Sequence, residues 1–169
     1  GLWSIVIGNF VQRSAKQSYQ QTVFMKILTD IKVKELIGDD VHTIPANTKI
    51  IDAIRNYFMP YRRKYFSVEK DGKIIGVLHY SQVRKVPSNM RRKTHVEMAM
   101  YPIEEVPSVE EELDAKEALM EITKGNAKKG MLAVYDNEHH FEGILNKDDF
   151  QAALYFNDNV DLSDIMQGV

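Results

Sequence analysis

Helical and extended hydrophobic patterns alternate along this chain in an order that occurs twice. Residues 12–30 contain no proline or glycine, and apolar side chains recur every four positions, which predicts a helix with one buried stripe. A short helix over 33–37 should end at the break formed by residues 38–40. The elements then expected are a strand over 41–45, a helix over 49–58, strands over 64–70 and 73–78, and a helix over 80–85. Asp71-Gly72 between the two strands predicts a tight hairpin turn.

The second half repeats the order strand, helix, strand, strand, helix. The expected elements are a strand over 103–107, a helix over 111–123, strands over 131–135 and 141–145, and a helix over 147–155. Pro107 follows Pro45 by 62 positions (107 − 45 = 62) and Gly143 follows Gly76 by 67 (143 − 76 = 67). Ser108 is the expected cap of the helix over 111–123. The chain therefore contains two like units, each too small to bury a good core alone.

The composition removes several kinds of chemistry. The 169 residues include no cysteine, so a disulfide framework, a thiol nucleophile and a thiolate zinc site are excluded. His139 and His140 are adjacent in a polar turn, where neighbouring side chains point in opposite directions, so we expect solvated turn residues and no metal site. We identify no nucleophile–base pair either. The chain as given is expected to have no enzymatic activity.

The charges are distributed unevenly although the net charge is only −2. Residues 33–93 hold 13 Lys/Arg and 6 Asp/Glu (13 − 6 = +7), and residues 94–156 hold 5 and 14 (5 − 14 = −9). A head-to-tail homodimer would place opposite charges together, and we predict that arrangement. Nucleic acid is not an expected partner, because the net charge is negative and no aromatic-interleaved basic motif is present. The basic clusters 62–64, 84–85 and 91–93 are expected to be solvated, with ligand phosphates or lipid head groups as alternatives.

The first eleven residues are apolar, with Trp3 near their start, but are shorter than the roughly 20 residues that cross a bilayer. Followed by Arg13 and Lys16, they are typical of the last turns of a membrane helix that leaves on the cytoplasmic side. An ordinary helix packed on the domain is the alternative. The division expected is a membrane-proximal stub and connecting helix (1–32), a first repeat (33–93), a second repeat (94–156) and a tail (157–169).

Each unit ends in the pattern glycine, two aliphatic residues, a polar residue, two further residues, a polar residue and an apolar one, at 76–83 and 143–150. This pair resembles the tandem cystathionine-β-synthase (CBS) domain pair, or Bateman module, over residues 33–156. The resemblance implies an α/β (α+β) fold of two β-α-β-β-α repeats in a pseudo-twofold arrangement, preceded by a helix. Residues 1–21 and 76–87 also look like the C-terminal part of site-2-type intramembrane zinc metalloproteases. That likeness implies a cytosolic regulatory tail, and the catalytic His-Glu-x-x-His motif is absent from this chain.

The CBS family binds adenosyl ligands such as AMP, ATP or S-adenosylmethionine between the units. The resemblance implies that Asp149 binds ribose hydroxyls through charge-assisted hydrogen bonds and that Asn146 replaces the usual hydroxyl residue near the phosphates. Lys147 lies between them, and His79 and Gln82 hold the corresponding places in the first unit. Asn146 and Asp149 also fit a helix-capping arrangement. A ligand-free dimerisation or docking module is therefore the alternative function.

Overall fold

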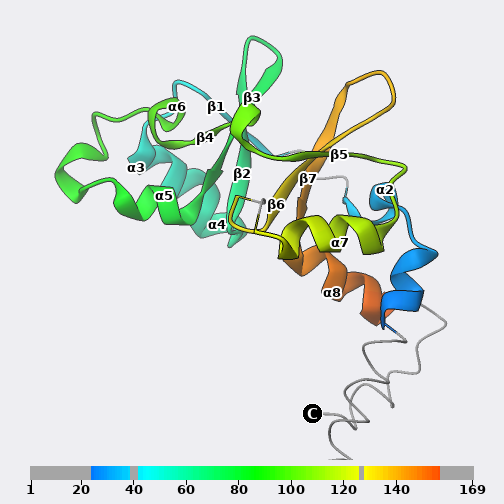
Figure 1. The fold of residues 1–169 in the computed structure, drawn as a ribbon. Coiled ribbons are helices and arrows are strands. Elements are labelled where there is room, and N and C mark those ends of the chain that lie inside the picture. Colours follow the sequence, from blue (N-terminus) through cyan, green and yellow to red (C-terminus); the bar gives the residue numbers. More distant parts are fainter. Residues whose placement is uncertain (1–23, 39–41, 126–127, 157–169) are drawn as a thin grey trace, which may run out of the picture.

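The computed structural model describes residues 24–38, 42–125 and 128–156, which form two sheets side by side with helices packed along them (Figure 1). Residues 24–29 are helical, in agreement with the end of the helix predicted over 12–30. The apolar stub, the remainder of that helix and the tail 157–169 lie outside the described residues. Among the helices of the described part, none combines the length and the apolar character that crossing a membrane requires.

The first sheet has four strands in the order β1 (Thr43–Pro45), β2 (Tyr65–Lys70), β3 (Lys73–His79) and β4 (Tyr101–Pro102). β1 pairs with β2 in parallel, and the other neighbours are antiparallel. The predicted hairpin is confirmed: Asp71 and Gly72 have φ values of 53° and 77°, as the tight turn between β2 and β3 requires.

The helices of the first half largely follow the prediction. The helix expected over 49–58 is a continuous helical run composed of α3 (Ile50–Ala53), a π-helical stretch (Ile54–Phe58) and α4 (Met59–Tyr61). α5 (Tyr80–Lys85) has the bounds that were predicted. A 3₁₀ turn (Ser88–Met90) and α6 (Val96–Ala99) lie between α5 and β4.

The second sheet consists of β5 (Ser108–Glu110), β6 (Met131–Tyr135) and β7 (Phe141–Asn146), with α7 (Ala115–Thr123) and α8 (Lys147–Phe156) packed on it. The strand predicted over 103–107 is wrong, because Ile103–Glu105 form a 3₁₀ turn and the strand begins at Ser108. The prediction that Ser108 caps a helix starting at 111 is also wrong, since α7 begins at Ala115.

Strand pairing gives the correct correspondence between the two units. Thr43 pairs with Ser67 and Ser108 pairs with Ala133, so β5 follows β1 by 65 positions (108 − 43 = 65). Pro107 is therefore not the counterpart of Pro45. In β5 only Val109 is apolar, and the strand's place is set by its backbone pairing with β6, which a hydrophobic pattern does not report.

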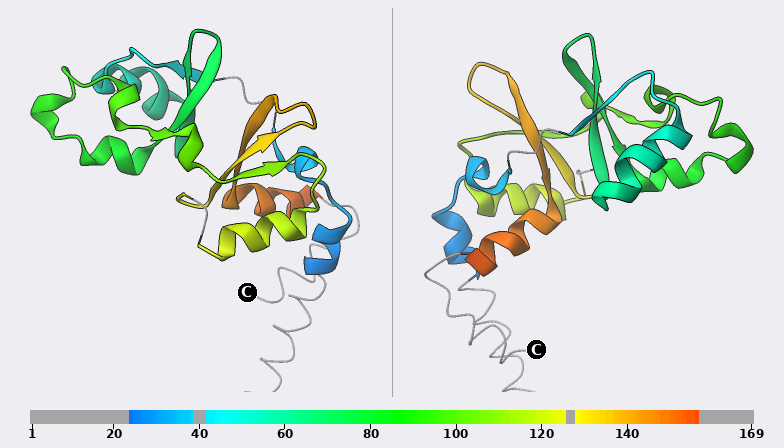
Figure 2. Two further views of the ribbon diagram at one scale, coloured as in Figure 1. Left: turned by 45° about the horizontal axis from the view of Figure 1, so that its top comes forward. Right: turned by 180° about the vertical axis from the view of Figure 1, so that it is seen from behind.

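Three apolar clusters hold the fold together. One lies under the first sheet around Phe66, and a second lies under the second sheet around Leu132 and Phe150. A third joins the two sheets and contains Val77, Val106, Met131, Ala133 and Ile144. In both views of Figure 2 the two hairpins lie next to each other and their turns project away from α7 and α8. The junctions where β3 enters α5 and β7 enters α8 thus belong to neighbouring sheets.

The cores cross the expected boundary between the repeats. Val33 of α2 (Val33–Leu36) belongs to the second cluster, although α2 lies at the start of the first repeat. Val96 of α6 belongs to the first cluster, although α6 lies at the start of the second repeat. The core of the second unit is thus completed by α2, from the first repeat. The core of the first unit is completed by α6, from the second repeat.

Candidate functional site

The residues predicted to bind a ligand lie at two strand-to-helix junctions. His79 and Gln82 are at the β3–α5 junction, and Asn146, Lys147 and Asp149 are at the β7–α8 junction. His79, Gln82 and Asn146 are nearly buried, Asp149 is partly buried and Lys147 is exposed. The local cause is the same in both places: an apolar strand ends at a polar residue, and the following residues adopt helical dihedrals.

Both junctions are closed by the same pair of hydrogen bonds. Asp149 Oδ2 accepts from the backbone N–H of Asn146 at 2.7 Å, and Asn146 Oδ1 accepts from the N–H of Asp148 at 3.0 Å. In the first unit Gln82 Oε1 accepts from the N–H of His79 at 3.0 Å. The capping interpretation of Asn146 and Asp149 is therefore confirmed, and Gln82 makes the equivalent bond at the first junction.

His79 completes the cap at its own junction through its ring. Its Nδ1 accepts from the backbone N–H of Ser81 at 3.2 Å. Burial lowers the pKa of His79 from 6.5, and the charges of Lys129 and Lys64 lower it further. The imidazole is therefore neutral at pH 7, with its proton on Nε2 because Nδ1 is an acceptor.

The residues just before β2 contact both junctions and link them. The backbone N–H of Tyr80, the first residue of α5, donates to the carbonyl of Lys64 at 2.8 Å. The ammonium of the same Lys64 contacts Asp148 Oδ2, in the first turn of α8, at 2.9 Å. Arg63 places its guanidinium 5.2 Å from the centre of the Tyr65 ring. One basic segment of the first unit thus reaches both helix starts.

The pKa values of the junction residues reflect this contact between the units. Burial raises the pKa of Asp149 above 3.8, while the Asn146 N–H and the charge of Arg63 oppose the rise. Burial and the Asp149 carboxylate raise the pKa of Tyr65 to about 12. Asp149 therefore lies within electrostatic range of two residues that precede it by more than eighty positions.

The sequence analysis did not predict three residues of this arrangement as site residues: Arg63, Tyr65 and Lys129. Arg63 was noted only within the basic cluster 62–64, for which ligand phosphates were one alternative. No local pattern identifies Tyr65 or Lys129, because Tyr65 reaches Asp149 and Lys129 reaches His79 only through the packing of one unit on the other.

Two other features lie apart from the junctions. A hollow of about 460 Å³ next to β5 and α7 is lined by residues that include Ser108, Glu112 and Glu121, and none of the predicted site residues borders it. His140 contacts Asp136 at 3.0 Å within the β6–β7 turn. In the described ranges no group of three or more His, Cys, Asp or Glu side chains is placed to hold a metal ion.

Comparison with protein families and solved structures identifies the architecture. Residues 33–89 match the model of the CBS domain family. The CBS domain of a bacterial CNNM/CorC family Mg²⁺ transporter in complex with ATP is similar to 82% of this chain and 97% of its own, with a TM-score of 0.68 and 17% identity. The CBS domain pair solved with 5′-methylthioadenosine and S-adenosyl-L-methionine is similar over 72% of this chain and 94% of its own, with a TM-score of 0.58 and 18% identity. These likenesses establish the fold.

One relative in sequence is a much longer protein than this chain. Rip3 of Mycobacterium tuberculosis (strain H37Rv), a zinc metalloprotease by name, is 26% identical to this chain over 109 residues, which is 64% of the chain. The chain spans only 28% of the length of that relative.

Proposed function

We propose that this chain, whose residues 33–89 are a CBS domain and whose fold is that of a CBS pair, is a regulatory module that senses an adenosyl ligand for an attached membrane-embedded zinc metalloprotease. The observation that carries the proposal is the position of Asp149. Its partly buried carboxylate stands in the first turn of α8, across from the basic segment that contains Arg63 and Lys64. A nucleotide needs this combination of an acceptor for its ribose and cations for its phosphates.

The capping bond of Asp149 is compatible with ligand binding. A carboxylate has two oxygens with about four acceptor sites, and the Asn146 N–H occupies one of them. The ribose hydroxyls can therefore donate to Asp149 while the cap stays formed. Arg63 and the exposed Lys147 are suited to phosphate oxygens. The candidate ligands are AMP, ATP and S-adenosylmethionine, and two of the structural neighbours were solved with ATP or with S-adenosyl-L-methionine.

Calorimetric titration of the whole chain with these three ligands tests the site. The informative variant is Asp149→Gln, since Gln82 makes the same cap in the first unit, so the variant keeps the fold and removes the charge. We expect micromolar binding of one ligand by the wild type and none by Asp149→Gln. Absence of binding by the wild type would contradict the sensor function. Binding retained in Asp149→Gln would move the site away from α8.

The attachment to a protease is supported by the partial similarity to Rip3 and by the likeness of the first eleven residues to the end of a membrane helix. It predicts that residues 33–156 lie on the cytoplasmic side of the membrane. Because this chain has no cysteine, Met98→Cys on exposed α6 introduces a single thiol into it. Within the longer membrane protein, an impermeant maleimide should label that thiol only from the cytoplasmic face. Labelling from the other face would contradict the orientation.

A ligand-free dimerisation or protein-docking module, with a head-to-tail dimer, is the second candidate. Three ion pairs already join the two charged regions within one chain: Lys34–Glu112, Lys64–Asp148 and Lys70–Glu97. They reduce the opposing charges to +4 and −6 (7 − 3 and 9 − 3), which still favours antiparallel contact. Sedimentation at rising NaCl should show dissociation of such a dimer, whereas salt-independent association would contradict the charge argument.

A further inference from the structure

The segment that leads into the first unit is bound by the second unit. The backbone N–H of Val33 donates to the carbonyl of Leu113 at 2.9 Å, and that of Lys34 donates to the carbonyl of Glu111 at 2.9 Å. We call residues 31–37 the N-terminal clip. Both bonds are made to the loop before α7. The helical residues 24–29 are anchored to the second unit as well, because Leu28 belongs to its apolar cluster.

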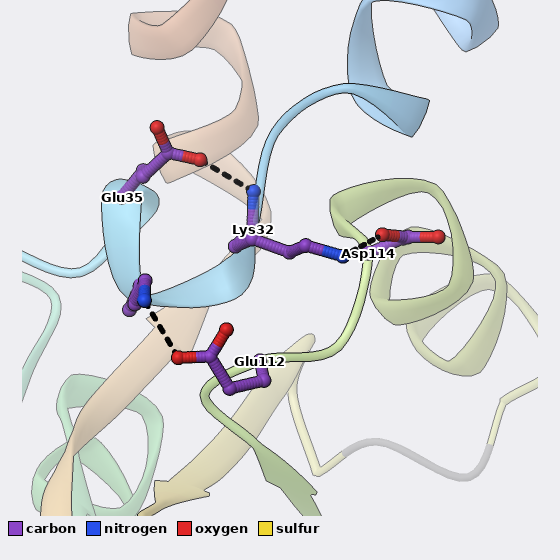
Figure 3. Close-up of polar contacts among 5 residues, drawn as sticks. Lys32, Glu35, Glu112 and Asp114 are labelled. Carbon is purple, nitrogen blue, oxygen red and sulfur yellow. Dashed lines mark hydrogen bonds and ion pairs between the residues drawn. The ribbon is translucent and has the colours of Figure 1, made fainter.

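Side chains add two ion pairs and an apolar anchor to this contact. Lys32 contacts Asp114 and Lys34 contacts Glu112, each at 2.6 Å (Figure 3). Both pairs are exposed enough that each contributes little alone. Val33 and Leu28 are fully buried in the second core and provide the main attachment.

A second clip of the same geometry lies on the first unit. The N–H of Val96 donates to the carbonyl of Thr48 at 2.8 Å, and the N–H of Ile50 donates to the carbonyl of Thr94 at 2.9 Å. Val96 is fully buried in the first core, as Val33 is in the second. We call residues 94–100 the central clip. The two clips form a matched pair in one chain.

Each clip shares a core with one helix start. Phe150 follows Asp149 directly, is buried, and belongs to the same apolar cluster as Leu28 and Val33. In the first unit Val83 follows Gln82 and shares a cluster with Val96. Because protein interiors are close-packed, a shift of the first turn of α8 has to be accommodated by the side chains around Phe150.

We infer that the N-terminal clip is the output element of the second unit: a change at the start of α8 alters how firmly residues 31–37 are held, while the start of α5 acts on the central clip. The identity of the ligand that acts at α8 rests on the proposed function. By linkage, a ligand that tightens the clip is itself bound more weakly when the clip is loosened.

Amide hydrogen exchange of the whole chain, measured residue by residue by NMR, tests this coupling without any ligand. Asp149→Ala removes one of the two capping hydrogen bonds at the start of α8, and Gln82→Ala removes the equivalent bond at the start of α5. We expect Asp149→Ala to speed exchange at Val33 and Lys34 about fivefold, the effect of one lost hydrogen bond, and to leave the central clip unchanged. Gln82→Ala should speed exchange at the central clip and leave Val33 and Lys34 unchanged. Equal acceleration of both clips, or none at Val33 and Lys34 in Asp149→Ala, would overturn the inference.

Saturating ATP then separates the inference from the proposed function. If ATP slowed amide exchange at Val33 and Lys34 more than at Val96, the result would support both the inference and the proposed function. If ATP failed to bind while the two cap variants still acted on their own clips, the nucleotide function would be lost and the coupling would stand. If ATP bound but left the N-terminal clip unchanged, the output role would be refuted and the binding site would remain.

Discussion

Replacing Leu28 by alanine should destabilise the second unit, although this residue precedes the first unit in the sequence. The Leu28 side chain is fully buried in the cluster that contains Val33, Ala118, Leu132 and Phe150. Truncation removes its transfer free energy and leaves a cavity beneath α7 and α8. For fully buried leucines in other proteins the combined loss is about 3–5 kcal/mol. In a chain of this size each kcal/mol lowers the melting temperature by about 2–4 °C, so a decrease of about 6–20 °C is expected.

Scanning calorimetry of the whole chain measures this change, with Met59→Ala as the control. Met59 lies on α4 with 67% of its surface exposed, so its truncation should alter stability by less than about 1 kcal/mol. If Leu28→Ala melted within about 2 °C of Met59→Ala, residues 24–29 would not be part of the second core. The anchoring of the N-terminal clip, and the output role argued from it, would then lose their structural basis.

Three further predictions concern single positions. Gly76→Ala should lower the free energy of unfolding, measured in urea, by about 1–3 kcal/mol, because a Cβ there meets Met100 Sδ and the Tyr101 carbonyl. Gly143→Ala should be tolerated, because the nearest neighbour of its Cβ is Ile37 at 3.9 Å. The pKa of Asp149 is raised above 3.8, mainly by burial, so its contribution to stability is fully present below pH 3.8 and is lost as the pH rises through the folded-state pKa. Asp149→Gln should therefore gain stability relative to wild type between pH 4 and pH 7, and a melting difference that is constant over this range would contradict the argument. The same variant should lower the pKa of Tyr65 from about 12 in an NMR titration of the ring carbons, and an unchanged value would exclude the proximity of Asp149.

Local sequence patterns predicted the elements whose geometry is decided by neighbouring residues. The Asp71-Gly72 turn, β2, β3 and α5 were all placed correctly, because turn residues and hydrophobic periodicity act within a few positions. β5 was misplaced because a three-residue strand with one apolar side chain has no pattern of its own. Its position follows from pairing with β6, which lies more than twenty residues later in the sequence.

The same distinction applies to the candidate site. The two helix starts were found in the sequence because each motif is contiguous, and their caps were foreseen as one interpretation of Asn146 and Asp149. The approach of Arg63 and Tyr65 to Asp149 depends on how the sheets pack through the third apolar cluster. That each clip packs on the other unit also depends on tertiary contacts. The repeat visible in the sequence does not show it.

The two junctions together separate a structural from a functional reason for the carboxylate at position 149. Capping needs only an acceptor, and Gln82 supplies a neutral one to the N–H of His79 in the same geometry. Asp149 makes the equivalent bond at 2.7 Å, but its burial disfavours the charged form and raises its pKa. A neutral side chain would cap α8 without that cost, so capping alone does not account for the charge. Since an ionised acceptor binds hydroxyl donors more strongly than a neutral one, the excess cost at Asp149 favours a ligand at the second junction and a purely structural role for the first.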